Sequence, residues 1–182
     1  MIIGITGKSG VGKSTYANKI AKDFNMHVIH IDEISHKIME LPNVKENLIK
    51  TFGTNVIQNG LINRKYLGDM IFTNRHLYEE MNDIVWQEMK HEIDRELQNH
   101  ENVVLDWILL PHSHYWKLCD KKILITADER QRREKVMLRD NISEEYLDKR
   151  DSASIDYDDI KFDEIITNTY EGQWRKYEKQ QF

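Results

Sequence analysis

The sequence offers little that would cross-link, interrupt or anchor the chain. Its 182 residues include one cysteine, Cys119, so no internal disulfide can form and we expect a reducing, cytoplasmic environment. The apolar run at residues 1–5 is too short for a signal peptide, and no apolar stretch approaches the ~20 residues that span a membrane. The net charge of -5 gives no reason to expect a nucleic-acid partner.

Only two prolines interrupt a chain that is 40% hydrophobic and 31% charged, as expected of a single globular domain. Apolar runs predict strands at residues 2–6, 27–31, 103–110, 122–126 and 164–167. Periodic apolar residues and capping signals predict helices at about 13–24, 33–39 and 77–97, after Asp128, after Ser143 and at the polar C-terminus. This alternation predicts an α/β fold in three layers, a parallel sheet of about five strands with helices on both faces.

A glycine-rich segment joins the first expected strand to the first expected helix, and it fits the phosphate-binding pattern G-x-x-x-x-G-K-[ST]. The N–H groups of such a loop surround phosphate oxygens at the positive end of the helix. Lys13 is then expected to reach the β- and γ-phosphates of ATP, and Ser14 to bind Mg²⁺. A turn that binds nothing is disfavoured by the strand and helix on either side. The expected nucleotide site is Gly7, Lys8, Ser9, Gly10, Val11, Gly12, Lys13 and Ser14.

Several classes of protein share a loop of this kind. A GTPase normally carries an Asn-Lys-x-Asp guanine signature, which this sequence lacks, and the chain is too short for a typical motor ATPase domain. The sequence therefore favours a small-molecule kinase that uses ATP and Mg²⁺.

Two aspartates are candidates for the chemistry beside the loop. Asp32 follows the second expected strand, at the sheet edge where ligands bind, so it could accept the proton of an attacking hydroxyl or cap the next helix. Asp106 lies in an apolar run, where a lone buried carboxylate needs a partner. We expect it to support Mg²⁺ behind Ser14, with a hydrogen-bonded structural aspartate as the alternative.

Basic residues crowd a predicted helical segment: Arg130, Arg132, Arg133, Lys135 and Arg139. A mobile segment with such charges can act as a lid that neutralises phosphate charge and excludes water. Their spacing prevents all of them from facing one way, so about half are expected to be solvated. Arg139, followed at once by Asp140, is the expected phosphate contact.

The segment after Asp106 holds side chains with more than one possible use. His112, His114 and Cys119 lack the CxxC or HExxH spacing of a zinc site, so we expect no zinc there. Trp107 could stack on an acceptor base, although core packing is the commoner use of a lone aromatic on a strand.

Several of these motifs together resemble the dephospho-coenzyme A kinase family over nearly the whole chain. The resemblance lies in Ser14-Thr15 after the glycine loop, in Ile31-Asp32-Glu33-Ile34, in Phe52-Gly53 through Arg64 to Phe72, in Arg139-Asp140, and in the segment ending at Asn168. It implies that Asp32 is the catalytic base, with Lys13 and Arg139 also catalytic, and that Thr15, Arg139 and Asn168 contact ATP. Candidates for acceptor contacts are Arg64, Trp107 and His112.

The resemblance also implies an organisation within the single domain at 1–182. The core is expected at about 1–40 and 100–182, a helical acceptor-binding region at about 41–99, and the lid at about 128–152. The implied reaction transfers the γ-phosphate of ATP to the ribose 3′-hydroxyl of dephospho-coenzyme A, a step of coenzyme A biosynthesis.

The sequence departs from the family pattern mainly on the acceptor side. The family usually has Asp, Arg, His, Pro, Pro and Glu where this chain has His30, His36, Trp86, Gln87, Ile108 and His112. The residues expected to bind ATP match. A nucleoside, a nucleotide or another metabolite therefore stays open as the acceptor, as does a nucleotide-binding module without catalysis. The sequence leaves the oligomeric state open.

Overall fold

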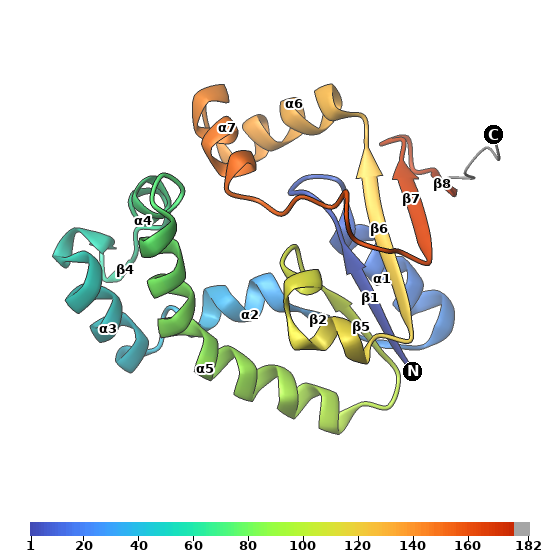
Figure 1. Ribbon diagram of the computed structural model, residues 1–182, viewed down its shortest axis with the longest axis horizontal. Coiled ribbons are helices and arrows are strands. Elements are labelled where there is room, and N and C mark those ends of the chain that lie inside the picture. Colours follow the sequence, from blue (N-terminus) through green and yellow to red (C-terminus); the bar gives the residue numbers. More distant parts are fainter. Residues whose placement is uncertain (177–182) are drawn as a thin grey trace.

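The computed structural model describes residues 1–176, in which strands and helices alternate (Figure 1). In chain order the main elements are β1 (Ile2–Thr6), α1 (Lys13–Phe24), β2 (His27–His30), α2 (Ile31–Ile38), α3 (Pro42–Phe52), β3 (Ile57–Gln58), β4 (Leu61–Ile62), α4 (Arg64–Ile71), α5 (Arg75–Asn99), β5 (Val103–Asp106), β6 (Lys121–Ala127), α6 (Glu129–Asp140), α7 (Glu144–Ser152), β7 (Glu164–Asn168) and β8 (Trp174–Lys176). Short 3-10 helices lie at Thr54–Val56, Leu110–His112 and His114–Leu118.

The main sheet has the strand order β2-β5-β1-β6-β7-β8. The first five of these strands are parallel to their neighbours, and β8 runs antiparallel to β7. β1 is bonded on one side to β5 and on the other to β6, so the loop that leaves its carboxyl end opens in the middle of the sheet. In Figure 1, α6 and α7 lie beyond that end of β6.

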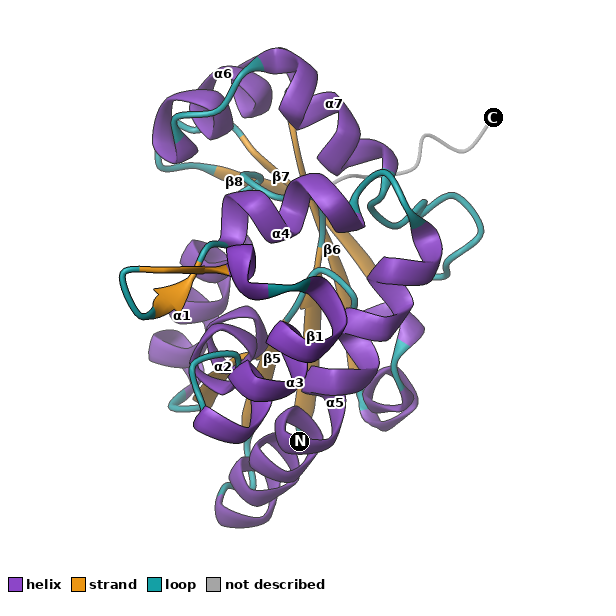
Figure 2. Ribbon diagram, turned by 90° about the vertical axis from the view of Figure 1, so that its left-hand side faces the viewer, coloured by secondary structure: helices purple, strands orange, loops and turns teal. Residues whose placement is uncertain are grey.

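Both faces of the sheet are covered by helices. Successive residues of a strand point to opposite faces, and in β5 Val103 and Leu105 enter one core while Val104 enters the other. The first core also contains side chains of α2, α3 and α5, and the second contains Tyr16 and Ala17 of α1. Figure 2 shows α3, α4 and α5 in front of the sheet. Among residues 1–176, every helix is too short or too polar to span a bilayer.

The apolar periodicity at 77–97 correctly predicts the long helix α5. Its buried residues Val85, Met89 and Ile93 recur every four positions and form one stripe toward the core. The helix begins where the Asn74 side chain accepts a hydrogen bond from the N–H of Leu77. The capping predictions at Asp128 and Ser143 are also confirmed by bonds of this kind.

Two predicted element boundaries are wrong. The strand expected at 103–110 ends at Asp106, where the chain turns toward a 3-10 helix although Trp107 and Leu110 are buried. The second helix begins at Ile31 with His30 at its N-cap, which places Asp32 in the first turn and excludes it as the cap.

The end of the chain also differs from the prediction. Residues Trp174–Lys176 pair with β7 as a strand in place of the start of a C-terminal helix, and the remainder of that predicted helix lies outside the described residues. The sheet therefore has six strands, of which β8 alone runs against its neighbour in the part of the chain that the structure describes.

Candidate active site

The glycine-rich loop adopts a conformation that only glycine accommodates easily. Gly10 and Gly12 have φ angles of 85° and 94°, in the left-handed region. A Cβ atom on Gly12 would lie 2.5 Å from Nδ2 of Asn168, and one on Gly10 would lie 2.2 Å from Val136. The loop is thus pressed against the end of β7 and one face of α6, without room for side chains at these two positions.

Side chains from α6, from the end of β7 and from the turn after β7 donate hydrogen bonds to backbone carbonyls of the loop. Nη1 of Arg132 donates to the carbonyl of Ser9 at 2.9 Å, the hydroxyl of Tyr170 to that of Gly10 at 2.8 Å, and Nδ2 of Asn168 to that of Val11 at 2.9 Å. Across a trans peptide the next N–H points the opposite way. The amides of Gly10 and Gly12 therefore point away from these donors, as a phosphate cradle requires.

The charges of Lys13 and Asp32 interact beside the loop, where both residues line the cleft. Lys13 is 8% exposed, and burial lowers the pKa of its ammonium while Asp32 opposes this shift. The side chain of Asp32 is exposed to water in the cleft. The surrounding protein atoms nevertheless remove part of the hydration of its carboxylate, and this desolvation raises the pKa of Asp32 to about 6. The charge of Lys13 works against that rise. Asp32 is therefore a stronger base than an ordinary aspartate while still ionised at neutral pH.

Behind the loop, Asp106 connects two strands of the sheet to Ser14. Its Oδ2 accepts a hydrogen bond from Oγ of Ser14 at 2.6 Å and lies 2.8 Å from Nδ1 of His30. The hydrogen bond with Asp106 raises the pKa of His30. Asp106 itself is 3% exposed, and its Oδ1 has no hydrogen-bond partner within residues 1–176.

The oxygens of Ser14 and Asp106 fit a hard cation such as Mg²⁺. The hydroxyl of Ser14 donates a hydrogen bond to Asp106, so its oxygen presents lone pairs on the other side, and oxygen ligands of this kind suit Mg²⁺. The unpartnered Oδ1 of Asp106 is costly to bury unless a water of hydration or a cation completes it.

The basic residues of α6 differ in their exposure to solvent. Arg132 is fully buried and holds α6 to α7, because its guanidinium pairs with Glu129 and Asp151 as well as with the Ser9 carbonyl. Arg130 is 88% exposed and lies on the solvated face. Arg132 thus has a structural role: it holds α6 against α7 and against the phosphate loop.

Two arginines reach the loop from α6 and α7. Nη2 of Arg139 lies 3.4 Å and Nη2 of Arg150 lies 2.6 Å from Oγ of Ser9. Both also bond to Asp140, and the bond from Arg139 is the main reason that the pKa of Asp140 falls to about 2. Arg150 was not predicted from the sequence, because only the packing of α7 on α6 brings it here.

The loop opens into a cleft of about 1570 Å³ between the sheet edge, α4, α5 and the α6–α7 pair. A site for one drug-sized ligand has roughly 300–1,000 Å³, so this cleft has room for two substrates. Trp107 is 6% exposed and stacks on Trp86, with ring centroids 6.0 Å apart and an interplanar angle of 11°. Trp107 therefore packs in the core, the commoner of its two expected uses, and both tryptophans also line the cleft.

Most of the predicted site residues meet in this cleft. Its lining includes Ser9, Gly10, Gly12, Lys13, Ser14, Thr15, Asp32, Arg64, Trp107, His112, Arg139 and Asn168. Asp106 stands behind Ser14, and the lining does not include Gly7, Lys8 or Val11. The lining also includes Arg150 and Tyr170, and His30 joins the site through Asp106; none of these three is predicted from the sequence to take part in nucleotide binding.

A parallel sheet with this phosphate loop, and a cleft that places a carboxylate opposite the loop lysine, define a P-loop phosphotransferase with a hydroxyl acceptor. The model of the family described as dephospho-CoA kinase matches residues 1–170, and the chain belongs to that family.

Individual relatives agree with the family match. A dephospho-CoA kinase of Fusobacterium nucleatum is 32% identical, with 82% of this chain and 78% of the relative covered. A dephospho-CoA kinase of Bacillus cereus is 29% identical over 92% of this chain and 88% of the relative. A crystal structure of a Thermus thermophilus protein superposes with a TM-score of 0.75 at 26% identity, covering 93% of this chain and 88% of that one. The fold also matches a dephospho-CoA kinase from Campylobacter jejuni, at a TM-score of 0.58 and 24% identity over 92% and 88% of the two chains.

Proposed function

We propose that this protein transfers the γ-phosphate of ATP to the ribose 3′-hydroxyl of dephospho-coenzyme A. The observation that carries the proposal is the convergence of Lys13, Asp32 and the Ser14–Asp106 pair on one cleft, in a chain of this family. The single buried thiol of Cys119 and the use of ATP favour the cytoplasm as the place of reaction.

Asp32 serves as the base in this proposal. The acceptor hydroxyl gives its proton to the Asp32 carboxylate, its oxygen forms a bond to the γ-phosphorus, and the bond from that phosphorus to the β–γ bridging oxygen breaks to release ADP. A pKa of about 6 suits this task, because the group is ionised at neutral pH yet holds a proton better than an ordinary aspartate.

Cationic side chains balance the charge that moves during transfer. Lys13 at the loop, with Arg139 and Arg150 from the α6–α7 pair, would surround the β- and γ-phosphates. Ser14 would hold Mg²⁺ with Asp106 behind it, and the bound ion would neutralise phosphate charge. Residues 128–152 would act as the lid, since Arg139 and Arg150 contact the loop only while α6 and α7 rest on it.

The acceptor would occupy the part of the cleft between the core and residues 41–99. Arg64 at the start of α4, Trp107 after β5 and His112 line this part, and they offer a charge for phosphate groups and ring surfaces for a base. The departures from the family pattern at His36 and Trp86 line the same cleft. The identity of the acceptor is therefore the part of the proposal that most needs a direct test.

An acceptor panel provides that test. Purified protein is incubated with Mg·ATP and, separately, with dephospho-coenzyme A, adenosine, AMP and thymidine, and ADP release is measured. We expect turnover with dephospho-coenzyme A and a product that carries the new phosphate on the 3′-oxygen, as located by ³¹P NMR. Lys13→Ala should abolish turnover in the same assay. Turnover with a nucleoside or nucleotide but none with dephospho-coenzyme A would refute the proposed acceptor. If no acceptor caused the release of ADP, the proposed kinase activity would be refuted.

A further inference from the structure

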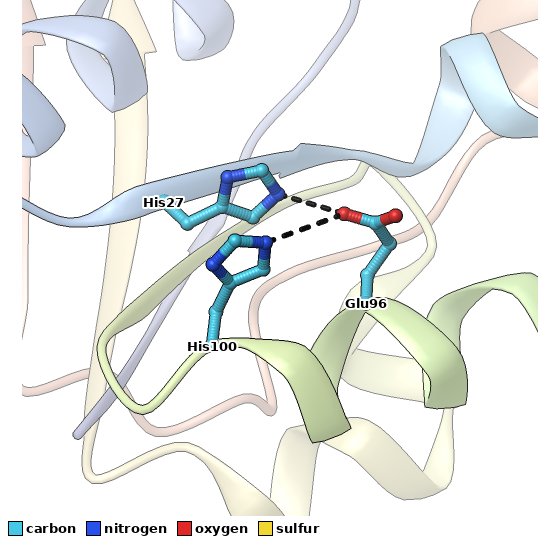
Figure 3. A group of neighbouring side chains, drawn as sticks. All are labelled: His27, Glu96 and His100. Atoms are coloured by element: carbon cyan, nitrogen blue, oxygen red, sulfur yellow. Dashed lines mark hydrogen bonds and ion pairs between the residues drawn. The ribbon is translucent and has the colours of Figure 1, made fainter.

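Away from the cleft, two histidines and a glutamate gather where β2 begins and α5 ends. His27 is the first residue of β2, Glu96 lies in the last turn of α5, and His100 is the C-cap of that helix. Figure 3 shows the three side chains meeting, with a ring nitrogen of each histidine directed at the same carboxylate oxygen. None of the three has a part in the proposed phosphate transfer, and His27 stands at the opposite end of β2 from His30.

The donor atoms of this cluster are close enough to share one ion. Oε2 of Glu96 lies 2.8 Å from Nε2 of His27 and 3.9 Å from Nε2 of His100, and one donor atom from each residue lies within 4.8 Å of the other two. Donors bound tetrahedrally at about 2.0–2.1 Å lie roughly 3.3 Å from one another, which falls between the two measured separations. Side-chain adjustments of less than an ångström would then satisfy those two distances.

The rings must also turn so that their lone pairs converge. They are stacked with centroids 3.7 Å apart and an interplanar angle of 13°, so their nitrogens point in similar directions. The side chain of His100 is 40% exposed at the end of its helix, which leaves it free to rotate. The other carboxylate oxygen of Glu96 lies 3.7 Å from Nη2 of Arg95, which is hydrogen-bonded to Glu92 and leaves both oxygens of Glu96 available to an ion.

We propose that His27, Glu96 and His100 form a binding site for Zn²⁺, with water in the fourth position. Two imidazoles and one carboxylate suit Zn²⁺ and neighbouring divalent transition metals, whereas Mg²⁺ and Ca²⁺ prefer oxygen donors alone. The bound ion would tie α5, whose residues Tyr78 to Met89 line the cleft, to the edge strand β2. The bound ion stabilises the folded chain, because the unfolded chain does not preserve the site.

The test is a zinc titration of tag-free protein by calorimetry, in buffer without ATP because ATP chelates the metal. We expect one Zn²⁺ per chain, a rise in Tm with Zn²⁺ but not with Mg²⁺ at the same concentration, and at least a tenfold weaker affinity in both His27→Ala and His100→Ala. Glu96→Gln should weaken zinc binding as well. If His27→Ala does not fold, the zinc affinities of Glu96→Gln and His100→Ala provide the test.

The chain supplies a matched control on the same helix. His76 forms an i,i+4 pair with Glu80, 3.6 Å apart, and within residues 1–176 no third histidine, cysteine or carboxylate completes a metal site around this pair. His76→Ala should leave zinc affinity unchanged. Equal affinity in wild type, His27→Ala and His100→Ala, or no binding to the wild type at micromolar Zn²⁺, would overturn the site. A zinc-edge anomalous peak between His27 and His100 in a zinc-soaked crystal would support it, and a peak elsewhere alone would refute it.

Discussion

Replacing the buried Arg132 with methionine should destabilise the fold, although this residue belongs to a cluster that the sequence associates with phosphate. The substitution keeps the length of an apolar stem and removes the guanidinium. That group is fully buried and donates to Glu129, to Asp151 and to the carbonyl of Ser9. Its loss would therefore loosen both the α6–α7 contact and the outer side of the phosphate loop.

The magnitude follows from how well water can replace each lost bond. Glu129 is 54% exposed and regains water, so its part in the loss is small. Asp151 is 16% exposed, and removing the partner of a buried charge costs about 3–5 kcal/mol. Because Asp151 keeps some exposure and a more distant neighbour in Arg133, we expect the free energy of unfolding to fall by about 3 kcal/mol.

Urea unfolding followed by the fluorescence of the four tryptophans measures this loss. Arg133→Met is the matched control, because Arg133 stands next in the chain, pairs with Glu144 and Asp148, which are 71% and 61% exposed, and approaches Asp151 only to 3.7 Å. The control should lose far less stability. A similar, small loss in both variants would refute the assignment of Arg132 as an anchor.

Four further substitutions separate catalysis from folding. Arg139→Ala and Arg150→Ala should leave unfolding nearly unchanged and lower kcat by at least about tenfold each, as measured by ADP release, because both approach the loop from its open side. Asp32→Asn should lower kcat by about 10²–10⁴ while ATP binding, measured by calorimetry, persists. In the wild type, kcat/KM should hold above pH 6 and fall as the pH drops below it, because the raised pKa of Asp32 makes the base take up its proton there; a profile flat to pH 5 would contradict this role. Gly12→Ala should abolish ATP binding in a folded protein, because its Cβ would strike Asn168 at a φ of 94°; unchanged affinity would show that the loop relaxes.

Local signals in the sequence were enough to predict the region around the phosphate loop. The helix expected at about 13–24 is α1 (Lys13–Phe24), because a glycine turn, a strand before it and an amphipathic stretch after it all indicate the same boundary. The strand predicted at 103–110 is longer than the observed strand Val103–Asp106 for a physical reason. Trp107 and Leu110 are as buried as strand residues, and a run of apolar residues does not distinguish burial within a sheet from burial beneath helices.

Residues that depend on tertiary packing could not be predicted in this way. Arg150 reaches Ser9 across 141 positions of sequence, and His30 meets Asp106 across 76. The proposed zinc site joins residues 69 positions apart, since His27 meets Glu96. The strand β8 is short and polar, and its place depends on pairing with β7. Spacing rules find neighbours along a helix or a loop, and none of these contacts is of that kind.

The geometry of the acceptor tests the central claim most directly. A crystal structure with a non-hydrolysable ATP analogue, Mg²⁺ and dephospho-coenzyme A should place the ribose 3′-oxygen within about 2.6–3.2 Å of an Asp32 carboxylate oxygen, in line with the γ-phosphorus. An acceptor bound elsewhere, or an Asp32 carboxylate turned away from the terminal phosphate, would contradict the account.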